Sequence, residues 1–154
     1  MLVWLFAFTA YAFPATVTKI ADGDTFTVME SMQKIRVRIF GIDAPEHDQP
    51  YGDNATAMLA QLILGQTVEI EPPHGGRSFP KSFDRIVGVV HRNGQDVELV
   101  MIGSGNAWAY DRFRVQDVYD DAQGQAVIHG VGLWAGNPVP PWDWRKQHSH
   151  QRRH

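Results

Sequence analysis

The chain has 154 residues, of which 44% are hydrophobic and 20% charged, so we expect one compact domain with its own core and exclude a disordered chain. A formal net charge of −3 disfavours a protein that coats duplex nucleic acid through a broad basic surface. It leaves open an enzyme whose positive charge is concentrated in one cleft. The absence of cysteine excludes disulfides, thiol nucleophiles and cysteine-based zinc sites.

The N-terminal segment is almost wholly apolar from residue 2 to residue 13, and residues 10–12 read Ala-Tyr-Ala. An apolar run followed by small residues at alternate positions is typical of a signal peptide. The run is too short to span a bilayer, which takes about 20 residues. We therefore expect residues 1–12 to be a signal peptide, and the mature protein to be secreted or periplasmic and without a membrane segment. An apolar first strand is the alternative.

Alternation of polar and β-branched residues predicts strands, which are expected at 15–20, 25–29, 34–40, 67–71 and 86–91. In the third of these, Arg36 and Arg38 share the face opposite the apolar residues. The alternation alone does not choose which arginine serves a site. Asn93-Gly94 is a hairpin turn signal.

Helical spacing of apolar residues predicts three helices, which are expected at 53–64, 96–102 and 115–129. The proline-rich stretch 137–144 is expected to be irregular, and the polar residues 145–154 to form a flexible tail. This set of elements predicts an α+β, mainly β fold: a five-stranded OB-fold barrel flanked by three helices, over residues 13–144.

Three acidic and two basic side chains next to the predicted turns carry the chemistry. Asp24, Asp43 and Glu46 offer the oxygen ligands that a hard divalent cation prefers, and Arg38 and Arg85 offer the guanidinium groups that suit phosphate. A metal, a carboxylate base and two guanidinium groups are sufficient to hydrolyse a phosphodiester. Each aspartate taken alone fits an ordinary turn residue, so the argument depends on the combination.

Six short motifs extend this set: Asp22-Gly-Asp-Thr25, the run from Arg38 to Glu46, Tyr51-Gly52, Phe83-Asp-Arg85, Asn93-Gly94 and Gly132-Leu-Trp134. In this order and spacing they resemble the staphylococcal (micrococcal) nuclease family, also called thermonuclease-like, over residues 15–144. The resemblance implies an OB-fold barrel with three helices. It also implies calcium-dependent hydrolysis of DNA and RNA that leaves 3′-phosphates and has little sequence preference.

The resemblance also implies which residues bind the metal and activate water. In the family pattern, Asp24 and Asp43 supply carboxylate ligands to Ca²⁺, and the backbone carbonyl of Ala44 supplies a further ligand. Ala44 stands where the type member of the family has threonine, and a backbone ligand tolerates that change. Glu46 acts on the attacking water.

The same pattern assigns the phosphate to Arg38 and Arg85, and it offers Lys81 and Tyr110 as substrate-binding candidates. Asp84 stands where the family usually has glycine. It is expected either to pair with Arg85, which would weaken the grip on phosphate, or to face solvent.

Two other functions compete with the nuclease interpretation. The first is a catalytically inactive OB-fold module that binds nucleic acid, which typically lacks the metal carboxylates or the arginines. The second is a glycoside hydrolase using Asp43 and Glu46. Adjacent arginines disfavour it, because they would keep both carboxylates ionised and leave no general acid. The nuclease interpretation implies DNA and RNA as substrates, no stable protein partner and a monomer.

Overall fold

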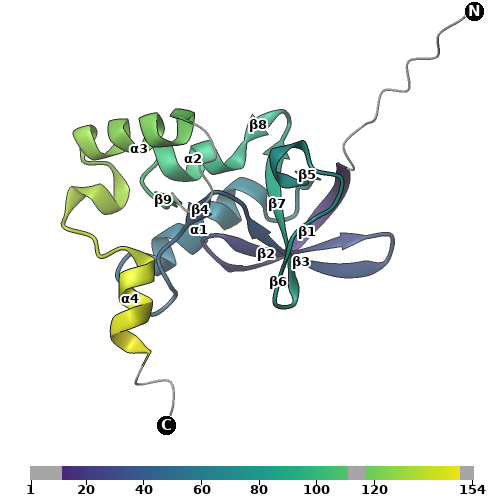
Figure 1. Ribbon diagram of the computed structural model, residues 1–154, viewed down its shortest axis with the longest axis horizontal. Coiled ribbons are helices and arrows are strands. Elements are labelled where there is room, and N and C mark those ends of the chain that lie inside the picture. Colours follow the sequence, from purple (N-terminus) through teal and green to yellow (C-terminus); the bar gives the residue numbers. More distant parts are fainter. Residues whose placement is uncertain (1–11, 111–116, 150–154) are drawn as a thin grey trace, which may run out of the picture.

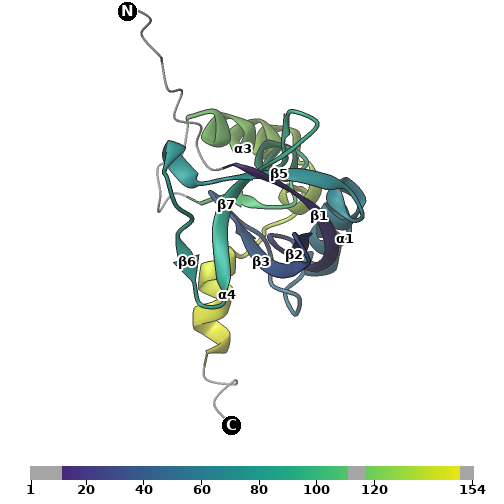
Figure 2. The same cartoon turned by 90° about the vertical axis from the view of Figure 1, so that its right-hand side faces the viewer.

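The computed structural model describes residues 12–110 and 117–149. Its main strands are β1 (Phe13–Asp22), β2 (Thr25–Glu30), β3 (Gln33–Ile39), β5 (Thr67–Glu71) and β7 (Arg85–Arg92). They pair antiparallel in the order β3-β2-β1-β5-β7, and a parallel pairing of β3 with β7 closes the sheet into a barrel (Figures 1 and 2). The five-stranded OB-fold barrel expected from the sequence is confirmed.

Four short strands within the described residues accompany the barrel strands. They are β4 (Ile42–Asp43), β6 (Lys81–Ser82), β8 (Gln95–Asp96) and β9 (Trp108–Ala109). β6 and β8 both pair with β7, whereas β4 and β9 form a separate two-stranded sheet. In that sheet Asp43 lies opposite Trp108, so backbone pairing fixes the position of Asp43.

The described residues form four α-helices: α1 (Gly52–Ile63), α2 (Val97–Gly103), α3 (Asp117–His129) and α4 (Pro141–His148). Two single-turn 3₁₀ helices, η1 (Pro73–Gly75) and η3 (Gly132–Ala135), complete the set. The first three helices match those expected, and the Asp96 side chain caps α2 by accepting a hydrogen bond from the Leu99 N–H. Residues 115–116 of the third predicted helix lie outside the described residues.

Helix α4 corrects the sequence prediction that residues 137–144 are irregular, and it continues to His148, within the segment expected to be a flexible tail. Proline is well tolerated at the first helical position, and here Pro141 begins the helix. The last turn carries Arg145, Lys146 and His148, and positive charge suits the C-terminal end of a helix dipole. Residues 150–154 of the predicted tail lie outside the described part of the chain.

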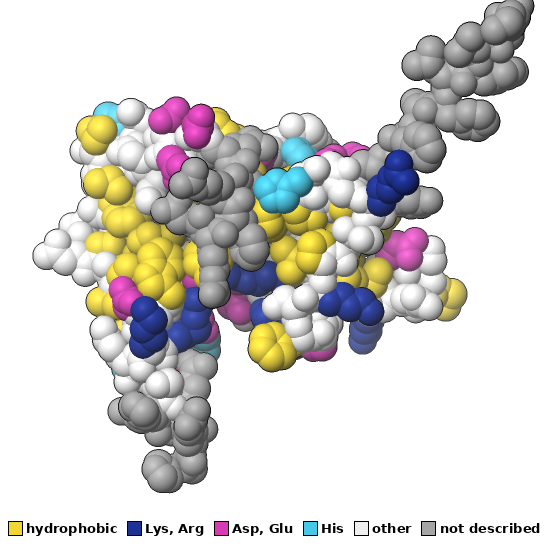
Figure 3. All heavy atoms as spheres, in the orientation of Figure 1, with side chains coloured by type: hydrophobic (Ala, Val, Ile, Leu, Met, Phe, Trp, Pro, Cys, Tyr) yellow, Lys and Arg dark blue, Asp and Glu magenta, His cyan; other side chains and the backbone are white. Residues whose placement is uncertain are grey.

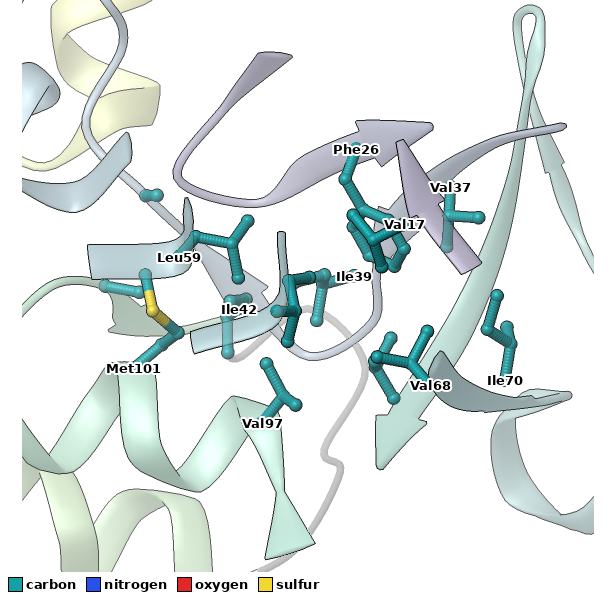
Figure 4. Packing of buried hydrophobic residues seen from close by; sticks show 14 of the residues in the cluster. Val17, Phe26, Val37, Ile39, Ile42, Leu59, Val68, Ile70, Val97 and Met101 are labelled. Carbon is teal, nitrogen blue, oxygen red and sulfur yellow. The ribbon is translucent and has the colours of Figure 1, made fainter. Parts of the chain in front are cut away.

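The hydrophobic core fills the barrel and continues under α1 and α2 (Figure 4). Its fully buried members include Val17, Phe26, Val37, Ile39, Leu59, Val68, Ile70 and Met101. Burial of each large side chain stabilises the fold by about 1.5–3 kcal/mol. This packing ties α1 to the strands and so holds the β1–β2 turn and the β4 segment against each other.

Within the described ranges, no helix has both the length and the apolar character needed to cross a bilayer. The predicted signal peptide falls almost entirely on residues outside those ranges and stays a prediction.

Candidate active site

One polar pocket of about 470 Å³ brings together segments that are far apart in the sequence. Its lining comes from the β1–β2 turn, β3, β4 and the loop after it, the β6–β7 turn, the end of β9 and helix α4. The lining residues are Asp22, Asp24, Arg38, Asp43, Ala44, Pro45, Glu46, Ser82, Phe83, Arg85, Tyr110 and Arg145. Every predicted site residue except Lys81 is among them. Figure 3 shows basic and acidic side chains gathered around the hollow between α4 and the β6–β7 hairpin.

Asp24 is buried at the β1–β2 turn, with only 6% of the residue exposed. One carboxylate oxygen accepts a hydrogen bond from the Ala44 N–H at 2.7 Å, and the other accepts one from the Thr25 hydroxyl at 3.1 Å. The Asp24 N–H in turn donates to the Asp22 carboxylate at 3.1 Å. These bonds fix the Asp24 carboxylate beside β4, where the family pattern expects a metal ligand.

Asp43 is almost fully buried, and Arg38 reaches it from β3. Arg38 Nη2 lies 3.1 Å from Asp43 Oδ1 and also donates to the Ile42 carbonyl at 3.2 Å, while Nη1 forms an ion pair with Asp24. Arg38 therefore bridges the two aspartates expected to bind metal. Burial lowers the pKa of Arg38, and the negative charges of Asp43 and Asp22 oppose that shift.

Asp22 lies at the mouth of the same turn. Burial raises the pKa of its carboxyl, and the positive charge of Arg38 opposes the shift. A carboxylate whose charge is partly neutralised by a neighbouring arginine suits a supporting position beside a metal ligand.

The two arginines that β3 places on one face have different partners. Arg38 lines the pocket, whereas Arg36 pairs with Asp84 outside it. The hydrogen bond from Arg36 lowers the pKa of the Asp84 carboxyl, which is exposed. Asp84 thus takes Arg36 as its ion-pair partner, and Arg85 donates instead to the Thr25 hydroxyl at 3.3 Å. Arg85 therefore lines the pocket and is not drawn out of it by Asp84.

The two substrate-binding candidates lie in different places. Tyr110 lines the pocket and its ring lies 5.8 Å from that of Trp142. Lys81 is exposed on β6 and lines a neighbouring cavity of about 270 Å³ together with Arg36, Asp84 and Arg85. Lys81 is therefore outside the pocket that holds the carboxylates. Phe83, which the sequence analysis placed in a motif but gave no role at the site, is at the pocket edge and 95% exposed.

Arg145 of α4 is the largest addition that the structure makes to the site. Its Nη2 lies 2.7 Å from Asp43 Oδ2, and its Nη1 donates to Glu46 Oε1 at 2.7 Å and to Asp43 Oδ1 at 3.2 Å. The hydrogen bond to Asp43 raises the pKa of Arg145. Glu46 and Asp43, predicted to act on water and on metal, are thus joined through one guanidinium group.

Aromatic contacts hold α4 in this position. The Trp142 ring lies 6.3 Å from that of Trp108, which in turn lies 5.2 Å from that of Trp134. Trp144 Nε1 donates to the Asp48 carboxylate at 3.3 Å. The Gln49 side chain donates to the Val139 carbonyl at 2.5 Å and so ties the segment before α4 to the loop after β4.

The donor chemistry of the pocket fits a hard cation, because carboxylate oxygens of Asp24, Asp43 and Glu46 line it together with Ala44. Over the described residues, however, no three acidic or histidine side chains converge as a ready-made metal site. Guanidinium groups pair with these carboxylates instead: Arg38 contacts Asp24 and Asp43, and Arg145 contacts Asp43 and Glu46.

Comparison with known proteins identifies the family. Residues 36–136 match the model of the staphylococcal nuclease homologue family. An uncharacterized endonuclease of Escherichia coli is 37% identical over 131 residues, which cover 84% of this chain and 82% of the relative. A micrococcal nuclease of Shigella flexneri is 35% identical over 149 residues, which cover 87% of this chain and 81% of the relative.

A staphylococcal-like nuclease of Arabidopsis thaliana is 35% identical over 115 residues, which cover 74% of this chain and 34% of the relative. The enzyme class expected from the sequence, a hydrolytic nuclease, is confirmed at the level of the family. The chain belongs to the staphylococcal nuclease homologue family.

Proposed function

We propose that this nuclease is a calcium-dependent endonuclease that hydrolyses DNA and RNA with little sequence preference and leaves 3′-phosphates. The observation that carries the proposal is the composition of one pocket, in which Asp24, Asp43 and Glu46 face Arg38 and Arg85. The carboxylates suit a hard cation and the guanidinium groups suit a phosphodiester. Because the pocket offers groups for the backbone of the substrate, contacts to base edges are expected to contribute little.

Asp24, Asp43 and the carbonyl of Ala44 would hold the calcium ion. When bound, the ion supplies positive charge to an oxygen of the scissile phosphate. The hydrogen bonds from Thr25 and from the Ala44 N–H keep the Asp24 carboxylate oriented before any ligand arrives. Such preorganisation lowers the reorganisation needed when the substrate binds.

Glu46 orients a water molecule for attack on phosphorus in line with the leaving group, and takes up its proton. Its side chain is 27% exposed, so water has access to it. Arg38 and Arg85 neutralise the charge that grows on the phosphate oxygens. The Thr25 hydroxyl accepts a hydrogen bond from Arg85 and so helps to aim it into the pocket.

We further propose that residues 1–12 are a signal peptide and that the enzyme acts outside the cytoplasm as a monomer. The apolar run and the Ala-Tyr-Ala sequence support export. A requirement for calcium suits that location, because the ion is abundant outside cells.

Glu46→Gln tests the assignment of the base. The variant keeps the size of the side chain and a hydrogen-bond acceptor for Arg145, but it cannot take up a proton. We expect turnover of single-stranded DNA with saturating calcium to fall by about 10²–10⁴-fold, while DNA binding is retained. Glu69→Gln, on an exposed position of β5, is the matched control and should turn over like wild type. Near-wild-type turnover of Glu46→Gln would show that another group activates the water.

A further inference from the structure

The contacts of Arg145 place a positive charge where the proposed metal ligands converge. Its guanidinium group contacts both carboxylate oxygens of Asp43 and one of Glu46, with two of these distances at 2.7 Å. Two parallel contacts to one carboxylate are the strongest geometry available to arginine. Asp43 has 1% of its side chain exposed, so solvent contributes little to neutralising its charge.

A divalent ion and this guanidinium group need the same oxygens. The Asp43 oxygens already receive Arg145 on both sides and Arg38 on Oδ1. Three of the roughly four lone-pair positions of the Asp43 carboxylate are thus occupied. A metal ion that binds Asp43 competes with the guanidinium groups for these positions and is repelled by their positive charge, and the withdrawal of one guanidinium group removes both obstacles.

Arg145 is better placed to withdraw than Arg38. The Arg38 side chain is 19% exposed and bridges Asp24, Asp43 and the Ile42 carbonyl. The Arg145 side chain is 38% exposed, and its ion-pair partners are Asp43 and Glu46. Helix α4 itself stays anchored through the rings of Trp142 and the hydrogen bond of Trp144, so only the side chain of Arg145 needs to swing.

We propose that Arg145 is a cation latch: without metal it holds Asp43 and Glu46, and it releases them when a calcium ion binds. The inference rests on the proposed function, because it takes Asp43 as a metal ligand. The latch offsets the repulsion between the two carboxylates in the metal-free protein. It also weakens calcium binding, because only the molecules with a released Arg145 are competent to bind.

Calcium titration of the nucleic-acid-free protein, followed by calorimetry, tests the competition without reference to activity. Arg145→Gln should bind calcium about tenfold more tightly than wild type, which corresponds to about 1.4 kcal/mol. Lys146→Gln is the matched control, because it removes the same charge from the next residue of α4. Among the described residues, the Lys146 ammonium group pairs only with Asp143. Salt screens the exposed Lys146 charge, so this substitution should change the calcium affinity by no more than about twofold.

Thermal unfolding of the same proteins separates a latch from a purely structural arginine. With EGTA, Arg145→Gln should melt at a lower temperature than wild type, because Asp43 and Glu46 lose their partner. With saturating calcium that difference should disappear, because the ion replaces the guanidinium group in both proteins. A structural role for Arg145 predicts an equal loss of melting temperature in both conditions.

The outcomes separate the latch from the proposed function. Tighter binding by Arg145→Gln, with destabilisation confined to EGTA, supports the latch. Equal calcium affinities of wild type and Arg145→Gln overturn the latch and leave calcium dependence intact. Failure of both proteins to bind calcium overturns the proposed calcium dependence, and the latch with it.

Discussion

The close packing under the β1–β2 turn makes Gly23→Ala the most informative single substitution. A Cβ atom added at Gly23 would lie 2.7 Å from the Cβ of Ala44 and 2.8 Å from the Cβ of Ala55. Gly23 is not among the glycines with positive φ, so alanine is allowed by the backbone and the effect is steric. The methyl group would enter between the turn that carries Asp24 and the segment that carries Ala44.

The expected magnitude follows from these two distances. Carbon atoms in contact are normally about 3.5–4.0 Å apart, so the turn must move by about 1 Å relative to β4 or α1. Overpacking of a core by one methyl group typically costs about 1–3 kcal/mol of stability. A displacement of about 1 Å between catalytic groups can reduce turnover by about 10²-fold.

Urea unfolding and steady-state hydrolysis of single-stranded DNA measure the two effects on one preparation. Gly124→Ala is the control, because Gly124 lies within α3 and a Cβ there meets nothing within 4 Å. Alanine at that position should stabilise the helix by about 0.5–1 kcal/mol and leave turnover unchanged. If Gly23→Ala kept wild-type turnover and stability, the turn would not depend on its contact with Ala44, and the account of how Asp24 is positioned would fail.

Two further predictions concern a buried acid and the pocket boundary. Glu98 is fully buried and accepts a hydrogen bond from the Val90 N–H at 2.9 Å, and burial raises its pKa well above the ordinary 4.5. The folded state thus binds the Glu98 proton more tightly than the unfolded state does. The free energy of unfolding of the wild type should therefore fall as pH rises from about 4.5 to the pKa of Glu98 in the folded state. The fall should be at most about 1.4 kcal/mol per pH unit. Urea unfolding of Glu98→Gln across that range should lack this fall, and an unchanged slope would refute the assignment. Arg85→Ala should lower kcat about 10²–10³-fold. Lys81→Ala, which changes a residue outside the pocket, should lower kcat less than about tenfold. Equal losses of kcat in the two variants would place Lys81 in the site.

The barrel strands could be predicted from the sequence because their signal is local. In β3, for example, Val37 and Ile39 are buried while Arg36 faces outward, as the alternation requires. The parallel pairing of β3 with β7, which closes the barrel, joins residues such as Val37 and Ile86. No local pattern encodes such a pairing: the set of elements predicted a barrel, but not which strands would close it.

The resemblance to a family already pointed to Arg38 rather than Arg36, and the folded chain supplies the physical reason. Alternation places them on the same face, and only the arrival of Asp84 from the β6–β7 turn gives Arg36 a partner outside the pocket. The Arg36–Asp84 ion pair also shows why Asp84 does not tie up its neighbour Arg85: the ion-pair partner of Asp84 is Arg36.

Arg145 was missed because its partner Asp43 is 102 residues away and because the stretch just before it, residues 137–144, was expected to be irregular. The expectation of an irregular stretch was based on its prolines, although proline at the first helical position favours a helix start. Basic residues clustered in the last turn of α4 were the second signal available in the sequence. Even with both signals, sequence alone would have given the helix but not its docking beside the pocket.

Digestion of plasmid and single-stranded DNA by the protein, with calcium and with EGTA, tests the central claim most directly. The account predicts that both substrates are degraded to 3′-phosphate products with calcium and remain intact with EGTA. Degradation at the same rate in EGTA would contradict the role given to the carboxylates of Asp24 and Asp43. Intact DNA in both conditions, with binding that weakens as salt rises, would make the protein a binding module rather than an enzyme.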